Sequence, residues 1–322
     1  AGRRPFLRLI DSEDGSYSPA EERAIREADA IVVALGFDEV LESEAYDRTW
    51  GLPEGQDALV SRTAALNPRT GVIVFAGGDV GMPWVDDVAA VCHAFYLGQA
   101  GGDALAALLT GRAHFSGRLP FTMARRWEDH PASTFYVGDP DHADRSSIVG
   151  PEARVRSHGE SPDAAALEAL PDETWPLRYG EGLHLGYRGF DAAGNEPLFP
   201  FGHGLSYTRF QVDGPRLDAP RMGPGGSVTV TARVANVGER EGTEVVQVYV
   251  ADPESSLPRP PKELKAFAKV FLVPGESREV ALVLDESWLR YYDDGAESWV
   301  VEPGTFRVLL GTSSRRIVGQ AE

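Results

Sequence analysis

Three carboxylates that follow one apolar run are the residues best suited to acid/base chemistry. The run AIVVALG covers residues 30–36, and Glu42, Glu44 and Asp47 follow it in LESEAYDRTWGLPEGQDALV (41–60). A positioned carboxyl group can donate or accept a proton when its surroundings shift its pKa towards the working pH. Most loop carboxylates are simply solvated. The position of these residues after a predicted strand therefore allows acid/base chemistry as one interpretation. It does not show which of the three carboxylates would carry it.

The residues around these carboxylates predict alternating helices and strands. In SPAEERAIREADA, Ser18 is placed as the N-cap, Pro19 as the first helical residue and Glu21 as the third residue of a capping box. This pattern predicts a helix from Pro19 to about Asp29. Apolar runs on both faces predict strands at 30–36, 71–78 and 90–97, and helices are predicted at 55–66 and 101–112, the latter ended by Gly111.

This alternation indicates an α/β domain with a mostly parallel sheet between helices, a three-layer sandwich. In such sheets, sites lie beyond the carboxyl ends of the strands. Three segments occupy such positions: the stretch at 41–60, GGDVGMPW (77–84) and GQAGGD (98–103). Asp79 in the second segment is on the site side, although turn chemistry explains it equally well.

The second half of the chain differs from the first in composition and in the periodicity of its apolar residues. The predicted α/β domain covers 1–135, and an irregular arm rich in Asp, His, Pro, Gly and Ser covers 136–210. From 211 to 322, short segments alternate apolar and polar residues between Pro and Gly turns. This pattern is typical of an all-β sandwich of the immunoglobulin or fibronectin type.

Composition excludes several classes of function. The chain has 322 residues and a net charge of −18, which opposes contacts with nucleic-acid phosphates. Its apolar runs are far shorter than the roughly 20 residues that span a bilayer. The seven histidines show no pair at metal-ligand spacing, and no phosphate loop or GxSxG turn is present. The single cysteine, Cys92, lies in apolar surroundings that predict a core residue.

Several phrases in fixed order carry a resemblance to a known family. They are ESEAYDR with LPEGQDALV, GGDVGMPW, GQAGGDALAALLTGRAHFSGRLPFTM, YGEGLHLGYRGFD and PLFPFGHGLSYTRF. Together they resemble the C-terminal half of glycoside hydrolase family 3 β-glucosidases, and the terminal β-region is similar to the fibronectin type III-like domain of that family. The resemblance covers nearly the whole chain.

The resemblance implies that this chain carries half of an active site. Family members usually begin with a (β/α)8 barrel that supplies an aspartate nucleophile, generally in a Ser-Asp-Trp motif, and most of the sugar-binding residues. Neither that motif nor the Lys-His motif of the barrel occurs in this sequence. We therefore expect the barrel elsewhere on the same precursor or on another chain. The α/β domain is expected to be N-terminally incomplete.

The resemblance also assigns roles to the residues of the opening stretch. It implies that Glu44 is the general acid/base, with Ala45 in place of the usual Gly and Glu42 as the alternative. Asp47 and Arg48 are expected to brace the loop. The candidate aromatics for the substrate are Phe37, Tyr46, Trp50 and Trp84, each of which has core or loop packing as its alternative. Gly202 and Gly204 in FPFGHGLSY are expected to permit a tight path beside aromatics that seal a domain seam.

The implied activity is the retaining hydrolysis of terminal β-D-glucosyl residues, without a metal or cofactor. A β-xylosidase or α-arabinofuranosidase of the same family is the alternative within the enzyme class. A non-catalytic carbohydrate-binding or scaffold remnant is the alternative outside it. Neither nucleic acid nor a membrane is expected as a partner, and the cellular compartment stays undecided.

Overall fold

The computed structural model describes residues 8–38, 41–42, 48–135 and 179–322, and the structural statements below concern these residues. They form two compact units. The first unit comprises the described residues up to 98 together with 125–127. The second comprises 99–124, 128–135 and 179–322. Residues 99–124 thus group with the C-terminal part of the chain, whereas the sequence assigned them to the α/β domain; the domain boundaries at 135 and 210 stay predictions.

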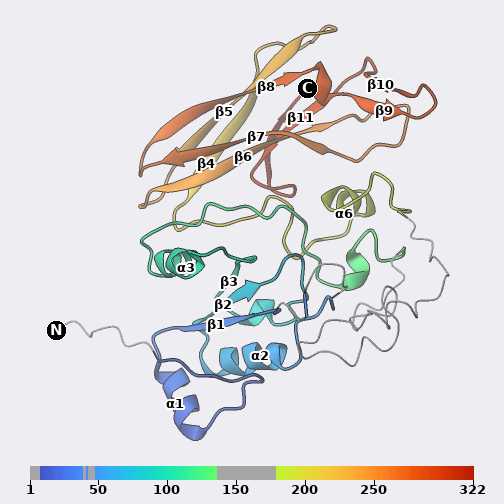
Figure 1. The fold of residues 1–322 in the computed structure, drawn as a ribbon. Helices are drawn as coiled ribbons and strands as arrows, with labels where there is room; N and C mark the ends of the chain where they lie inside the picture. The colour runs from blue at the N-terminus through green and yellow to red at the C-terminus, as the bar shows by residue number, and fades with distance from the viewer. Residues whose placement is uncertain (1–7, 39–40, 43–47, 136–178) are drawn as a thin grey trace, which may run out of the picture. The chain divides into compact units, whose positions relative to one another are not determined.

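The first unit is built on a three-stranded parallel sheet with strand order β1-β2-β3 (Figure 1). Its elements are α1 (Pro19–Glu27), β1 (Ile31–Gly36), α2 (Gln56–Leu66), β2 (Thr70–Phe75), the 3-10 turn η1 (Val85–Asp87) and β3 (Ala90–His93). Helix α1 begins with the predicted capping box, in which the Ser18 hydroxyl accepts from the Glu21 N–H and the Glu21 carboxylate accepts from the Ser18 N–H. The predicted α/β fold class is confirmed.

The register of this sheet brings the carboxyl ends of its strands together. Gly36 pairs with Phe75, and Val74 pairs with His93. Strand β3 ends earlier than the predicted 90–97, because the backbone of Phe95 turns into the left-handed region with φ +57°. The chain therefore leaves the sheet directly after His93, and the next residues lie at the same edge as the loops that follow β1 and β2.

The second unit contains a sandwich of two antiparallel sheets (Figure 1). Its helices are α3 (Gly101–Leu109) and α6 (Tyr187–Ala193), and the 3-10 turns of the chain include η2 (Trp127–Asp129) and η4 (Glu286–Trp288). Its strands are β4 (Phe210–Leu217), β5 (Ser227–Asn236), β6 (Gly242–Ala251), β7 (Glu263–Leu272), β8 (Ser277–Asp285), β9 (Tyr291–Asp293), β10 (Ser298–Val300), β11 (Arg307–Gly311) and β12 (Ile317–Ala321). One sheet has the order β12-β11-β6-β7 and the other β4-β5-β8, with a core of mainly Val and Leu between them.

Strand β6 departs from the expected alternation, because its polar residues are buried as well. Val246, Val248 and Val250 lie in the core of the sandwich. On the opposite face, Gln247 donates to the carbonyls of Gly202, at 3.1 Å, and Thr312, at 2.8 Å. Tyr249 on the same face packs edge-on against Tyr187, whose ring stacks on Phe201 at 4.9 Å. Residues 187–202 thus pack against the outer face of this sheet, and the buried Gln247 amide finds partners there in Gly202 and, from the loop after β11, in Thr312.

Gly202 is placed where a larger residue has no room. Its φ is +80°, and a Cβ would come within 2.2 Å of Gln247 Oε1, an atom that also accepts from the Tyr249 hydroxyl. Because Gln247 is held by three hydrogen bonds, we expect Gly202→Ala to lower the free energy of unfolding by about 2–3 kcal/mol. Gly225→Ala is the control, since φ is +70° there but nothing lies within 4 Å of a Cβ. Urea unfolding of both variants measures this change. Equal losses of unfolding free energy in the two variants would mean that the close contact with Gln247 does not destabilise the protein.

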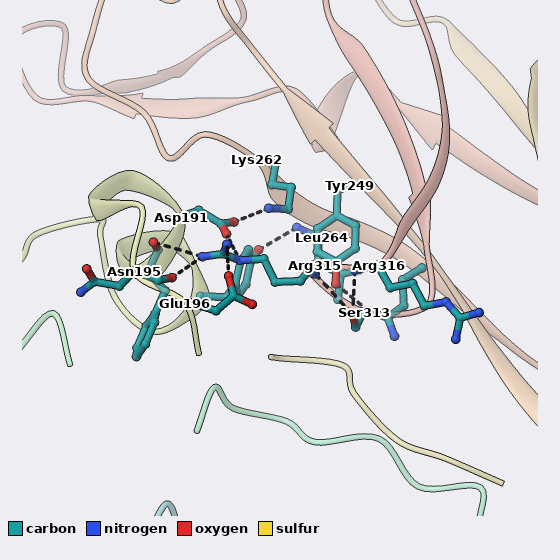
Figure 2. A network of polar contacts seen from close by, with 12 residues as sticks. Asp191, Asn195, Glu196, Tyr249, Lys262, Leu264, Ser313, Arg315 and Arg316 are labelled. Atoms are coloured by element: carbon teal, nitrogen blue, oxygen red, sulfur yellow. Dashed lines mark hydrogen bonds and ion pairs between the residues drawn. The ribbon is translucent and has the colours of Figure 1, made fainter. Parts of the chain in front are cut away.

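Helix α6 is tied to the β-sandwich by a network of charges (Figure 2). The Asp191 carboxylate bonds to Lys262, which directly precedes β7, and accepts from Arg315 Nε at 2.9 Å. Arg315 also donates to the backbone carbonyl of Asn195 at 2.6 Å and lies 3.3 Å from Glu196. The Leu264 N–H donates to the Tyr187 hydroxyl at 2.8 Å. The helix is therefore fixed by ionic and backbone contacts at both its ends.

Among the residues that the structure describes, no helix has the length and apolar character needed to cross a bilayer. Nor does this part of the chain bring together three His, Cys, Asp or Glu side chains that could hold a metal ion.

Candidate functional site

A polar cluster lies at the carboxyl edge of the parallel sheet and draws on the loops after all three strands. Glu42 and Arg48 come from the loop after β1, Gly77 from the loop after β2, and Tyr96 from the loop after β3. The cluster exists because parallel strands place their carboxyl ends at one edge. We call these four residues the edge cluster.

Glu42 is the centre of the edge cluster. Its carboxylate lies 3.1 Å from Arg48 Nε and accepts from the Gly77 N–H at 3.2 Å. It also accepts a hydrogen bond from the Tyr96 hydroxyl. The ion-paired side chains are largely buried, with 21% of Glu42 and 16% of Arg48 exposed. A carboxylate with a charged partner and two further donors is a strongly held acceptor.

These contacts fix the charge of Glu42. Burial acts to raise the pKa of its carboxyl group, but the Tyr96 hydrogen bond and the Arg48 guanidinium outweigh it and hold this pKa below its usual range. Burial and the bond to Glu42 raise the pKa of Tyr96 in turn, so that its phenol stays protonated. Glu42 is therefore an anion, and Tyr96 is a neutral hydrogen-bond donor to it.

Arg48 joins the edge cluster to its surroundings. Its guanidinium donates to the carbonyl oxygens of Thr49, at 2.8 Å, and Asp79, at 2.7 Å, and lies 4.7 Å from the centre of the Phe37 ring. The Trp50 indole N–H donates to the Asp79 carboxylate at 3.2 Å. Phe37 is 8% exposed, so in this structure its ring packs beneath Arg48. Arg48 therefore links the loops after β1 and β2 through main-chain and side-chain contacts.

Three of the predicted site residues, Glu44, Tyr46 and Asp47, lie outside the described residues. Trp84 is 1% exposed, and its indole N–H donates to Asp57 at 2.7 Å, which favours the packing interpretation of this residue. Burial raises the pKa of Asp57. Trp50 is half-buried, and its ring centre lies 6.5 Å from that of Trp127. The roles assigned to these residues stay predictions.

Sequence reasoning missed Tyr96 and Gly77 as members of the site. Tyr96 falls within the strand predicted at 90–97, although its position after an apolar run is the same signal that singles out Glu42. His93, the last residue of β3, was also missed; its Nε2 lies 3.0 Å from the Gly78 carbonyl oxygen. Burial lowers the pKa of His93, so that its ring is neutral at neutral pH.

Comparison with known families identifies both parts of the chain. The family model described as "Glycosyl hydrolase family 3 C-terminal domain" matches residues 13–207. The model described as "Fibronectin type III-like domain" matches residues 244–314. The first match alone spans more than half of the chain and includes the edge cluster.

Curated relatives cover nearly the whole chain. It is 37% identical over 309 residues to thermostable β-glucosidase B of Acetivibrio thermocellus. The aligned region covers 96% of this chain and 36% of the relative. It is 34% identical to β-glucosidase BoGH3A of Bacteroides ovatus, over 95% of this chain and 37% of the relative. The chain thus spans little more than a third of the length of these two relatives.

Solved structures agree with the sequence relatives. A family 3 β-glucosidase from Bifidobacterium adolescentis is 33% identical and matches with a TM-score of 0.76, over 95% of this chain and 41% of that one. A β-glucosidase from Streptomyces venezuelae, solved with D-glucose, is 34% identical with a TM-score of 0.76, over 94% and 34% of the two chains.

Proposed function

The chain belongs to glycoside hydrolase family 3, and from that premise we propose that it is the acid/base-bearing part of a retaining β-glucosidase. The observation that carries this proposal is the match to relatives named β-glucosidases over nearly all of the chain. Glu44 is the general acid/base of the proposed enzyme. It protonates the leaving oxygen of the glucoside, then takes a proton from the water that releases the sugar.

The surroundings of Glu42 support Glu44 over its neighbour. A general acid must begin the reaction protonated, with its pKa near the working pH. The Glu42 carboxylate instead has an Arg48 counter-ion and hydrogen bonds from Tyr96 and the Gly77 N–H, which lower its pKa. A carboxylate held ionised in this way cannot supply the first proton. Glu44, two residues further on, is the remaining glutamate of the motif.

The proposed reaction needs a second carboxylate. In a retaining glycosidase the two carboxyl groups lie about 5–5.5 Å apart, and the second attacks the anomeric carbon. We propose that an aspartate of a (β/α)8 barrel, on the same precursor or on another chain, is this nucleophile. The substrate is a β-glucoside, either an oligosaccharide or a glycosylated small molecule.

The experiment combines this chain with the barrel-bearing part and follows hydrolysis of an aryl β-glucoside. We expect the chain alone to be inactive, the combination to be active, and NMR to show β-glucose as the first product, since two displacements retain configuration. Aryl β-xyloside and α-arabinofuranoside are measured alongside. A higher kcat/KM for either pentoside would replace the β-glucosidase assignment, and an inactive but assembled combination would favour a non-catalytic role.

A further inference from the structure

We propose that Tyr292 and Trp299, on the outward face of the β9–β10 hairpin, form a binding surface for a soluble β-glucan chain. This surface goes beyond the catalytic role proposed above, and only the choice of a glucan as ligand rests on that proposed function. The hairpin lies in the second unit and belongs to neither sheet of the sandwich (Figure 1).

The two aromatic rings face solvent side by side. Tyr292 and Trp299 are directly paired across the two strands, and their ring centres lie 5.6 Å apart. The exposed fraction is 47% for Tyr292 and 66% for Trp299. Single exposed apolar side chains are common on proteins, but two large rings gathered on one face of a hairpin are typical of a contact surface. Mutual packing of the pair stabilises the hairpin, yet it leaves most of the Trp299 side chain in water.

The opposite face of the hairpin holds these rings in place. Side chains alternate along a strand, so Tyr291 and Val300 face the other way, and both are partly buried. The Arg259 guanidinium lies 5.4 Å from the centre of the Tyr291 ring. Arg259 is itself fixed by ion pairs with Asp252, at 3.0 Å, and Glu263, at 2.7 Å. A ligand therefore meets an aromatic pair that is already ordered, which lowers the entropy cost of binding.

The chain on either side of the hairpin is also anchored. Trp288 and Leu289, just before β9, pack against the core of the sandwich, as does Phe306, which precedes β11. The Ser256 N–H and hydroxyl both donate to the carboxylate of Glu302, which follows β10. The hairpin is thus held at both of its ends.

Carboxylates lie beside the aromatic pair. Asp294 and Glu297 are exposed in the turn that joins the two strands. The Asp293 carboxylate accepts from the Gly295 N–H at 2.8 Å, which fixes the path of this turn. Carboxylate oxygens accept hydrogen bonds from hydroxyl groups. Residues 291–300 contain no Lys or Arg, so this surface disfavours an anionic ligand.

The exposure of the site favours a neutral ligand with an apolar face. Solvent screens ion pairs at such a surface, so a basic partner would gain little from the carboxylates. Covering an aromatic ring, by contrast, removes apolar surface from water without needing any charge. A β-linked glucosyl residue has equatorial hydroxyls and axial C–H groups, so its faces are apolar and its rim offers hydroxyl donors. Such a residue matches aromatic rings bordered by carboxylates.

The angle between the rings indicates which form of glucan fits. The two ring planes meet at 73°, so both rings cannot stack on one flat chain. One ring can stack on a sugar face while the other contacts the edge of the same residue or of the next. This geometry suits a flexible, soluble chain, whereas the flat surface of a crystalline glucan requires coplanar rings.

The test measures how strongly the complete enzyme is retarded in native gels that contain a soluble mixed-linkage β-glucan. We expect wild type to be retarded and Trp299→Ala to bind at least about tenfold more weakly, because the larger ring is lost. Asp294→Asn combined with Glu297→Gln removes the acceptors but keeps the rings, and should weaken binding about threefold. Phe267→Ala is the matched control: Phe267 on β7 is 65% exposed, and its loss should leave binding unchanged.

Several results would overturn the proposal. They are retardation of wild type that is absent or unchanged in Trp299→Ala, equal retardation by a soluble α-glucan, and Trp299-dependent binding of an arginine-rich peptide in place of the β-glucan. If faster amide exchange of β9 and β10 shows that Trp299→Ala unfolds the hairpin, the carboxylate variant decides, and unchanged binding there overturns the proposal. Retardation needs no turnover, so an enzyme that binds the glucan at this surface but hydrolyses no aryl β-glucoside would contradict the proposed function alone.

Discussion

Replacing Glu44 by Ala in the complete enzyme is expected to lower kcat for β-glucosides with poor leaving groups by about 10²- to 10⁴-fold. Such substrates need a proton on the departing oxygen. An activated aryl glycoside with a nitrophenolate leaving group needs little protonation, so the first step should be lowered much less. The water that hydrolyses the glycosyl-enzyme still lacks its base, and azide, which needs none, should restore turnover and yield glucosyl azide. Steady-state kinetics with both substrate types checks this.

Glu42→Gln is the matched comparison for that variant. It stands two residues away and also removes one carboxylate, but its loss should be smaller and azide should not relieve it, because Glu42 is held ionised by Arg48 and Tyr96 and is not the proposed acid/base. Equal losses of kcat for both substrate types in Glu44→Ala, without rescue by azide, would contradict the assignment of Glu44. A larger loss for Glu42→Gln than for Glu44→Ala would move the acid/base to Glu42.

Asp191→Ala is expected to lower the free energy of unfolding of the second unit by about 3–5 kcal/mol. The Asp191 side chain is 6% exposed, and its carboxylate is shared by Lys262 and Arg315 (Figure 2). The Lys262 side chain is 12% exposed, so removal of the carboxylate leaves a poorly solvated cation without its counter-ion. Hydrogen exchange of the amides of β6 and β7, compared with wild type, measures the loss directly.

Glu279→Ala is the control for this loss. Glu279 pairs with Arg216 at 2.7 Å, but these side chains are 64% and 68% exposed. Solvent screens such a pair, so we expect a change below about 1 kcal/mol. If Asp191→Ala costs no more than this control, the network around α6 contributes no more than a surface pair.

Local features of the fold were predictable from the sequence. The capping box at Ser18 placed the start of α1, the apolar runs placed β1 and β2, and the alternation of apolar and polar residues after 211 indicated the strands of the sandwich. These signals are local, because they depend on neighbouring residues and on a period of two or 3.6. The short strands β9 and β10, of three residues each, were not predicted. Strand β3 is shorter than predicted because Phe95 adopts a positive φ.

The site was predictable only in part. The order of the motifs carried the family and the choice of Glu44, but Arg48 was expected to act with Asp47. Among the described residues it pairs with Glu42, and Tyr96 joins from a loop 54 residues away in sequence. No local pattern encodes such a contact, since it arises only when parallel strands align their carboxyl ends.

By itself, the sequence determined where most of the helices and strands form and which family the chain resembles, and it led to the proposal of Glu44 as the acid/base. The tertiary structure decided which groups meet at the carboxyl edge of the parallel sheet: an anion held ionised at residue 42, its Arg48 counter-ion, and a phenol from the loop after β3. It also decided that the polar residues of β6 are buried and that Asp191 joins two cations. The physical reason is the same in each case. Propensity and periodicity act between near neighbours, whereas burial and charge pairing act between groups that only the completed fold brings together.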